Sequence, residues 1–213
     1  MRKERFRKPS LLFIALVAWL ALGLQLYVML TSSSAQEPHG ILKALSYYFS
    51  YFTILTNLLV ALSFTISALM PASRAGGFFS TPSARTAVVV YIVVVGIVYS
   101  VALREIWDPR GLQLVADRLL HDATPILCAL YWVVFIPKRT LEWKDAFPWL
   151  IYPLLYLIYA LIRGLTTHWF SYYFIDFTTL GWGSVAVNVL IISAGFLALS
   201  FLFILLNRLM KRE

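Results

Sequence analysis

The chain is poor in the residues on which many soluble proteins and metal sites depend. Only 13% of its 213 residues are charged, three are histidines, and Cys128 is the single cysteine. One cysteine excludes an internal disulfide and any cysteine-based metal site, and two of the three histidines fall in predicted loops, which argues against a histidine-rich cluster. The sequence also lacks a glycine-rich phosphate loop and a Gly-x-Ser-x-Gly elbow. We therefore expect neither a metal nor another cofactor.

What the chain has instead is apolar residues in long runs. Hydrophobic residues make up 61% of the sequence and the mean hydropathy is +0.79, which is outside the range of soluble domains. A membrane-spanning helix needs roughly 20 apolar residues, and six stretches qualify. We expect an all-α polytopic membrane protein, a six-helix bundle that forms one domain over residues 1–213, with spans at approximately 10–31, 44–70, 85–103, 112–136, 147–166 and 183–207.

The basic residues are unevenly distributed between the predicted loops. Of 18 lysines and arginines, 13 fall on one side of the predicted membrane, so the positive-inside bias predicts that both termini are cytoplasmic. The net charge of +8 is explained by this bias and by anionic lipid headgroups, and we expect no nucleic-acid partner. The 13 basic residues on the predicted cytoplasmic side are Arg2, Lys3, Arg5, Arg7, Lys8, Arg74, Arg85, Lys138, Arg139, Lys144, Arg208, Lys211 and Arg212.

The first apolar stretch also has some features of a cleavable signal peptide. A basic start and an apolar run precede Ser33-Ser34-Ala35. The run from Leu11 to Leu30 is longer than the usual core of about 7–15 residues. We therefore interpret it as a retained span, whereas cleavage after residue 35 would leave five.

The second predicted span carries a stripe of polar side chains. At 100° per residue, Ser46, Ser50, Thr53 and Asn57 lie within about 40° of one another on a helix, with Thr56 at the margin. Serine and threonine in membrane helices usually bond to their own backbone or tighten helix packing. Ser50 and Thr56 are therefore more readily explained as structural residues than as functional ones.

Two further spans carry polar faces. On the fourth, His121 shares a face with Pro125 and Cys128, and on the fifth Tyr152 and Tyr156 follow one stripe. An ionisable side chain inside a membrane marks a functional site by default. Three such faces on three helices could converge on one interior cavity.

The predicted topology gives Thr53 and His121 a similar depth. If the second helix begins near Ala44 and the fourth at Leu112, each residue lies about nine residues in, roughly 14 Å from the same side. We expect the two side chains to lie close together.

A hydroxyl beside an imidazole suggests nucleophilic chemistry. A threonine hydroxyl is a weak nucleophile unless a base takes its proton, and neutral histidine is the usual base. Cleavage of an ester also needs hydrogen-bond donors for the developing oxyanion. Asn57 or a tyrosine of the fifth span, such as Tyr152, could supply one.

A carboxylate that would orient His121 is harder to find. Asp122 lies 100° around the helix from His121. Glu105 or Asp176 would then have to reach in from the outer loops. A Thr–His dyad without a third member is the alternative.

A different class of function fits the same polar cavity. A non-catalytic transporter or binding protein for a lipid or small solute would use His121 as a protonation switch. The absence of repeat symmetry and of acidic residues in the middle of spans argues against this alternative.

Three segments together resemble a known family. They are Tyr51-Phe52-Thr53-Ile54-Leu55-Thr56-Asn57-Leu58-Leu59, His121-Asp122-Ala123-Thr124-Pro125 and Trp149-Leu150-Ile151-Tyr152-Pro153. In their order along the chain they resemble the androgen-induced / androgen-dependent membrane protein family, and the chain looks like a bacterial member. The resemblance implies a multi-pass threonine hydrolase in the bacterial cytoplasmic membrane, with membrane lipids around it and fatty acid esters of hydroxy fatty acids, or related lipid esters, as substrate.

The resemblance also implies roles for particular residues. His121 matches the family histidine. The family nucleophile stands three residues before the asparagine, whereas here Thr53 stands four before Asn57 and Thr56 directly before it; the tyrosine-aromatic-threonine context favours Thr53. The predicted catalytic residues are therefore Thr53 and His121, and the candidates for substrate binding or the oxyanion are Asn57, Ser50, Thr56, Tyr152 and Tyr156.

Overall fold

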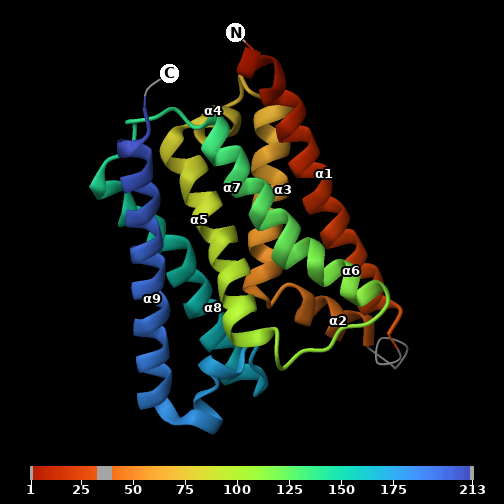
Figure 1. Ribbon diagram of the computed structural model, residues 1–213. Coiled ribbons are helices and arrows are strands. Elements are labelled where there is room, and N and C mark those ends of the chain that lie inside the picture. Colours follow the sequence, from red (N-terminus) through yellow and green to blue (C-terminus); the bar gives the residue numbers. More distant parts are fainter. Residues whose placement is uncertain (1, 33–39, 212–213) are drawn as a thin grey trace. The chain divides into compact units, whose positions relative to one another are not determined.

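The structure, a computed structural model, describes residues 2–32 and 40–211, and within these ranges all regular structure is helical (Figure 1). The chain divides into two compact units, Met1–Pro137 and Lys138–Glu213. The sequence predicts one membrane domain over residues 1–213, because six spans and short loops take up the whole chain. The candidate cleavage site at residues 33–36 lies outside the described residues.

The first unit is built around four long helical stretches. Helix α1 packs against α3, and α5 packs against both α3 and α7. Small and branched side chains at these contacts, including Ala18, Val60 and Val89, are fully buried, so the backbones approach closely as in membrane bundles. Its helices are α1 (Arg2–Leu30), α2 (Gly40–Tyr48), α3 (Phe52–Leu69), α4 (Arg74–Ser80), α5 (Pro82–Val98), the π-helical η2 (Tyr99–Leu103), α6 (Leu112–Arg118), the π-helical η3 (Leu119–Ala123) and α7 (Thr124–Phe135).

The second predicted span, 44–70, is not one helix, and this prediction was wrong. Helix α2 ends at Tyr48 and α3 begins at Phe52, with α2 running across the end of α3 in Figure 1. Tertiary contact explains the break, because the buried Tyr48 hydroxyl donates to the carbonyl of Leu22 in α1 at 2.8 Å. Thr53 is therefore the second residue of α3, at the N-terminal end of that helix. It does not lie nine residues along a longer helix.

The fourth predicted span, 112–136, is a helical run from Leu112 to Phe135 with a π-helical turn in the middle. It begins after Gly111, whose φ of +58° favours glycine. The Thr124 hydroxyl donates to the carbonyl of Leu119, five residues back, at 2.8 Å, which fits the wider turn. The run is oblique to α5 in Figure 1.

Five helices within the described ranges are long and apolar enough to cross a membrane. They are Glu4–Leu30, Phe52–Leu69, Pro82–Leu103, Trp143–Thr167 and Phe177–Leu209. Leu112–Phe135, which the sequence predicts as a further span, is not among them. The helices are consistent with an integral membrane protein.

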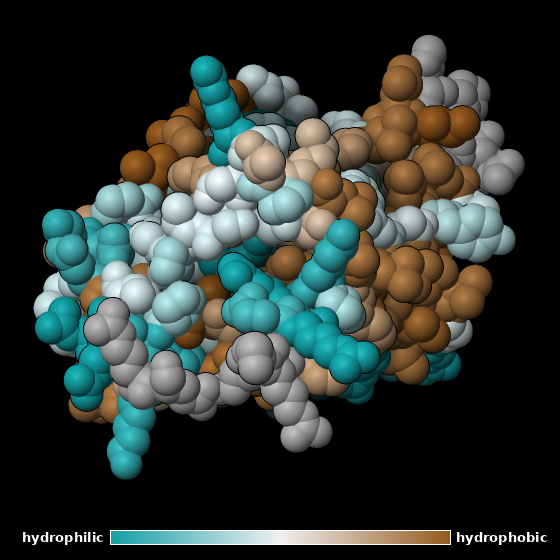
Figure 2. Space-filling model, turned by 90° about the horizontal axis from the view of Figure 1, so that it is seen from above, coloured by the Kyte–Doolittle hydropathy of each residue, from teal (hydrophilic) through white to brown (hydrophobic). Residues whose placement is uncertain are grey.

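Figure 2 looks directly at the end of the structure where α1 begins. Hydrophilic residues gather toward the middle of that face, and hydrophobic residues form much of its flank. Glu4, Arg5 and Lys8 of α1 are exposed. A polar end with an apolar flank is what a helix leaving a bilayer would present.

The second unit contains two long helices, α8 (Ile151–Thr167) and α9 (Phe177–Leu209), and the short 3₁₀ helices η4 (Trp143–Ala146), η5 (Pro148–Leu150) and η6 (Tyr173–Ile175). Asn207 of α9 holds the start of this unit, since its side-chain oxygen accepts from the amides of Thr140 and Leu141 at 3.0 and 3.1 Å. Gly181, with a φ of +75°, interrupts α9 near its beginning.

Candidate active site

Thr53 and His121 lie together in the first unit. The Thr53 hydroxyl is 3.3 Å from Nε2 of His121. Thr53 stands in the first turn of α3 and is 8% exposed, and His121 lies in the middle of η3 with a side chain that is 12% exposed. Both groups are thus largely shielded while keeping a small opening for a reactant.

The second nitrogen of the imidazole fixes its tautomer. Nδ1 of His121 lies 3.0 Å from the backbone oxygen of Asp117 and 3.2 Å from Oδ1 of the same residue. Both neighbours are acceptors, so the hydrogen-bond network assigns the proton to Nδ1. Nε2 then presents its lone pair to the Thr53 hydroxyl, which is the arrangement that a general base requires.

Asp117 is the carboxylate that sequence reasoning did not identify. It is 3% exposed and lies one helical turn before His121. The Tyr99 hydroxyl donates to Oδ2 of Asp117 at 2.5 Å, so both carboxylate oxygens face partners. The resulting chain of contacts is Thr53–His121–Asp117–Tyr99. Its first three members follow the order of a nucleophile, a base and an orienting acid.

Tyr99 also packs on the imidazole. Its ring is stacked on that of His121 with 3.9 Å between centroids and 14° between planes. Tyr99 begins the π-helical η2 at the end of α5, and His121 lies in the π-helical η3. Single π turns often occur at functional sites, and here two of them face each other.

A glycine permits this close approach. A Cβ at Gly96 of α5 would lie 3.0 Å from the backbone oxygen of His121 and 3.2 Å from the side chain of Pro125. Any larger residue would push α5 away from the segment that carries His121. Gly96 therefore sets the distance between the helix bearing Tyr99 and the helix bearing His121.

Asn57 connects the two segments that carry Thr53 and His121. Its amide nitrogen donates to the backbone oxygen of Thr53 at 2.9 Å and to that of Leu120 at 3.3 Å. Asn57 is fully buried, and its Oδ1 has no hydrogen-bond partner among the described residues. Because both amide hydrogens point to carbonyls, this conformation makes Asn57 a link between α3 and η3 and leaves an acceptor.

Asp122 belongs to a separate group at the edge of the site. It pairs with Arg104, and also with Arg118 at 2.8 Å. Arg104 in turn lies over the ring of Tyr99, 5.1 Å from its centroid. Asp122 is therefore shared between two arginines beside the site, and it is Asp117 that contacts His121.

The other carboxylates that the sequence offered for His121 are placed elsewhere. Glu105 is exposed. Asp176 caps α9 by accepting from the amides and hydroxyls of Thr178 and Thr179, and these bonds, that from the Thr178 side chain first, lower the pKa of its carboxyl. Within the first unit, it is Asp117 that contacts Nδ1 of His121.

The remaining predicted site residues have varied positions. Ser50 is fully buried in the turn between α2 and α3, and its hydroxyl donates to the carbonyl of Ser46 at 2.5 Å. Thr56 is fully buried one turn after Thr53. Tyr152 and Tyr156 are on α8 in the second unit.

No protein-family model matches the chain, and neither a curated protein nor a solved structure is similar enough to match it.

Proposed function

We propose that the protein is a membrane-embedded hydrolase that cleaves lipid esters with Thr53 as nucleophile. His121 is the general base and Asp117 orients it. One observation carries the proposal: Nε2 of His121 lies 3.3 Å from the Thr53 hydroxyl while Nδ1 faces the Asp117 carboxylate. A purely structural hydrogen bond would not need this buried acid behind the base.

The first half of the reaction is acylation. Nε2 of His121 accepts the proton of the Thr53 hydroxyl as Oγ1 attacks the ester carbonyl carbon. The carbonyl electrons move onto its oxygen, and the imidazolium is stabilised by Asp117. When the tetrahedral intermediate collapses, the bond to the alkoxy oxygen breaks, that oxygen takes the proton from His121, and the alcohol leaves.

The second half returns the enzyme to its starting state. Nε2 of His121 takes a proton from a water molecule as the water oxygen attacks the acyl-threonine carbonyl. Collapse of this intermediate breaks the bond to Oγ1 of Thr53, which recovers the proton from His121. The net reaction consumes one ester and one water and releases a carboxylic acid and an alcohol.

The beginning of α3 suits the negative charge that develops in both steps. Thr53 is the second residue of that helix. A helix N-terminus carries roughly half a positive charge, and the first amides point outward along the axis. An ester carbonyl attacked by Thr53 would lie within reach of this end, which would act as the electrostatic stabiliser of the oxyanion.

The membrane setting and the substrate class complete the proposal. We place Leu112–Phe135 in the membrane with the five apolar helices, which gives six spans and cytoplasmic termini by the distribution of basic residues. The resemblance to the androgen-induced / androgen-dependent membrane protein family supports fatty acid esters of hydroxy fatty acids, or related lipid esters, as substrates. It also supports a bacterial cytoplasmic membrane as the location.

The test is hydrolysis by purified protein in detergent, followed by mass spectrometry on a panel of lipid esters. We expect Thr53→Ala and His121→Ala each to abolish turnover, whereas Thr56→Ala, one turn along α3, retains it. A fluorophosphonate probe should label the parent protein and the Thr56→Ala variant but not Thr53→Ala.

Two outcomes would contradict the proposal. Full turnover in either folded Thr53→Ala or His121→Ala would exclude the pair as catalytic. Solute or lipid flux into proteoliposomes without any hydrolysis would favour the transporter alternative, in which His121 changes protonation during transport.

A further inference from the structure

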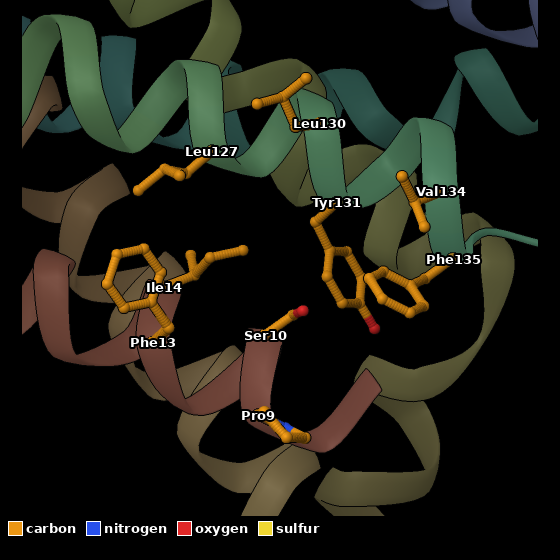
Figure 3. Close-up of a pocket in the computed structure, with 9 residues that line it drawn as sticks. All are labelled: Pro9, Ser10, Phe13, Ile14, Leu127, Leu130, Tyr131, Val134 and Phe135. Atoms are coloured by element: carbon orange, nitrogen blue, oxygen red, sulfur yellow. The ribbon is translucent and has the colours of Figure 1, made fainter. Parts of the chain in front are cut away.

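An apolar groove of about 380 Å³ lies between α1 and α7 in the first unit. Figure 3 shows Leu127 and Tyr131 of α7 pointing toward Phe13 and Ser10 of α1 across this groove. The Ser10 hydroxyl is already bonded to the carbonyl of Phe6 at 2.8 Å, so the groove offers almost no polar group to a ligand along its length. Its full lining is Pro9, Ser10, Phe13, Ile14, Leu127, Leu130, Tyr131, Val134 and Phe135.

Positive charge gathers at the end of the groove nearest the N-terminus. Arg5 and Lys8 are exposed on α1 just before Pro9. Arg7 is half-buried there and hydrogen-bonds the side chain of Tyr131, which lines the groove. Glu4 is the acid close to this group, 3.7 Å from Arg7, and it offsets only one of the three charges.

A buried arginine adds charge behind the wall of the groove. Arg85 of α5 is 2% exposed, and its hydrogen-bond partners are the neutral Ser63 and Ser67 of α3, with 2.5 Å to the Ser67 hydroxyl. Its guanidinium lies 5.9 Å from the ring centroid of Tyr131. Tyr131 therefore stands between two arginines, one at its hydroxyl and one at its ring.

We propose that this groove binds one acyl chain of an anionic phospholipid whose headgroup lies against Arg5, Arg7 and Lys8. The apolar lining matches a hydrocarbon chain, and its volume falls in the range of about 300–1,000 Å³ of ligand pockets. Basic residues at a membrane surface attract anionic headgroups. Charge complementarity thus selects an anionic lipid over a neutral one with the same chains.

This lipid site is separate from the proposed active site. The groove is formed by the first half of α1, around Pro9–Ile14, whereas α2 and the start of α3 are held near the last third of α1 through the bond from Tyr48 to Leu22. A lipid at the groove would therefore be a resident ligand of the first unit and not a substrate. Its binding should not depend on Thr53.

The experiment is native mass spectrometry of delipidated full-length protein with phosphatidylglycerol or phosphatidylcholine of identical acyl chains. We expect one phosphatidylglycerol to bind at least about tenfold more tightly than phosphatidylcholine, since tenfold corresponds to 1.4 kcal/mol. The Thr53→Ala variant should bind the lipid equally well, so the result is independent of the proposed hydrolysis.

Matched variants test the two parts of the site. Val134→Trp fills the groove and should reduce binding at least about tenfold, whereas Val133→Trp, at a neighbouring α7 position outside the groove and equally exposed (45% against 44%), should leave it unchanged. Replacing Arg7 and Lys8 together by Gln should remove the preference for phosphatidylglycerol, but the same change at the exposed Lys43 and Arg110 should not.

Three results would overturn the proposal. Equal affinity for the two lipids would exclude recognition of an anionic headgroup. Equal binding by Val134→Trp and Val133→Trp would exclude the groove as the acyl site. Loss of the lipid preference in the Lys43 and Arg110 variant would assign it to general charge and not to the α1 cluster.

Discussion

Two buried polar clusters in the first unit, one around Asp117 and one around Arg85, differ in the partners that surround the buried side chain. Asp117 contacts a titratable ring that in turn reaches a hydroxyl, through His121 to Thr53. Arg85 is surrounded by serine hydroxyls and by the faces of aromatic rings, with 4.1 Å from its guanidinium to the ring centroid of Phe64. Both charges are almost fully buried, at 3% and 2% exposure.

What distinguishes the two clusters is the group at which their contacts end. Burial alone does not, because each cluster removes a charge from solvent to the same extent. In the Asp117 cluster the contacts end at a lone pair beside a hydroxyl, so a proton can move. In the Arg85 cluster the guanidinium donates to serine oxygens of α3 and lies over the ring of Phe64, so these contacts hold α5 against α3.

Substitution of Asp117 by Asn should produce the largest effect. The amide cannot hold the proton at Nδ1 as a carboxylate does, nor can it stabilise the imidazolium, so we expect kcat to fall by roughly 10³- to 10⁴-fold. The rate of lipid ester hydrolysis by folded protein measures this.

The control for Asp117→Asn is Asp122→Asn, the same substitution five residues further along the chain. Asp122→Asn alters a carboxylate that pairs with Arg104 and Arg118 rather than with His121. It should leave kcat close to that of the parent protein. If the two variants lose activity equally, Asp117 has no special role.

The Arg85 cluster should respond in stability and not in rate. Arg85→Ala removes the partners of Ser63 and Ser67 and leaves a cavity beside Phe64, so the free energy of unfolding should fall by about 2–4 kcal/mol. Thermal unfolding in detergent measures the loss, and the kcat of the folded fraction should be little changed.

Arg85→Lys keeps the charge and should lose less stability, although it lacks the planar fork of the guanidinium. A loss of hydrolysis without any loss of stability would reverse the comparison.

Tyr99→Phe should have an intermediate effect. The ring stays stacked on His121, and only the hydrogen bond to Asp117 is removed. A bond to a charged group is worth about 1.5 kcal/mol or more, so we expect kcat to fall about tenfold. Tyr27→Phe removes an exposed hydroxyl of α1 outside the network, and it should leave kcat unchanged. Equal rates for the two variants would show that Tyr99 acts through its ring alone.

Gly96→Ala should have the smallest effect on the Asp117 cluster. The added methyl group meets the backbone of His121 at 3.0 Å, so α5 must shift by a few tenths of an ångström and the stack of Tyr99 on His121 loosens. We expect a reduction in kcat of a few-fold, measured as the rate of ester hydrolysis. Gly23→Ala in α1, where a methyl group has open space, should cause none. If both variants behave alike, the approach of the two helices does not control the site.

The sequence predicted the helical class and the juxtaposition of Thr53 with His121. Helical phase placed each residue on a polar face, and their side chains do lie 3.3 Å apart. The route to that result was partly wrong, since the stripe from Ser46 to Asn57 was assumed to follow one continuous helix. No glycine or proline marks the break at residues 49–51; it follows from contacts with α1, which local sequence does not encode.

Asp117 could have been found from the sequence. It precedes His121 by four residues, a spacing that puts two side chains on the same helix face. Tyr99 could not have been found in this way, because its place depends on how α5 packs against η3 and on two π turns that leave no periodic signal.

The π turn at Leu119–Ala123 makes the number of residues in this segment matter more than most of their identities. A π turn closes i→i+5 hydrogen bonds and so accommodates one residue more than an α-helical turn. Deleting any one residue of the turn would restore α-helical hydrogen bonds and remove the wider turn that carries His121. Among related chains, we therefore expect side chains around His121 to vary while the length between Asp117 and Pro125 stays fixed.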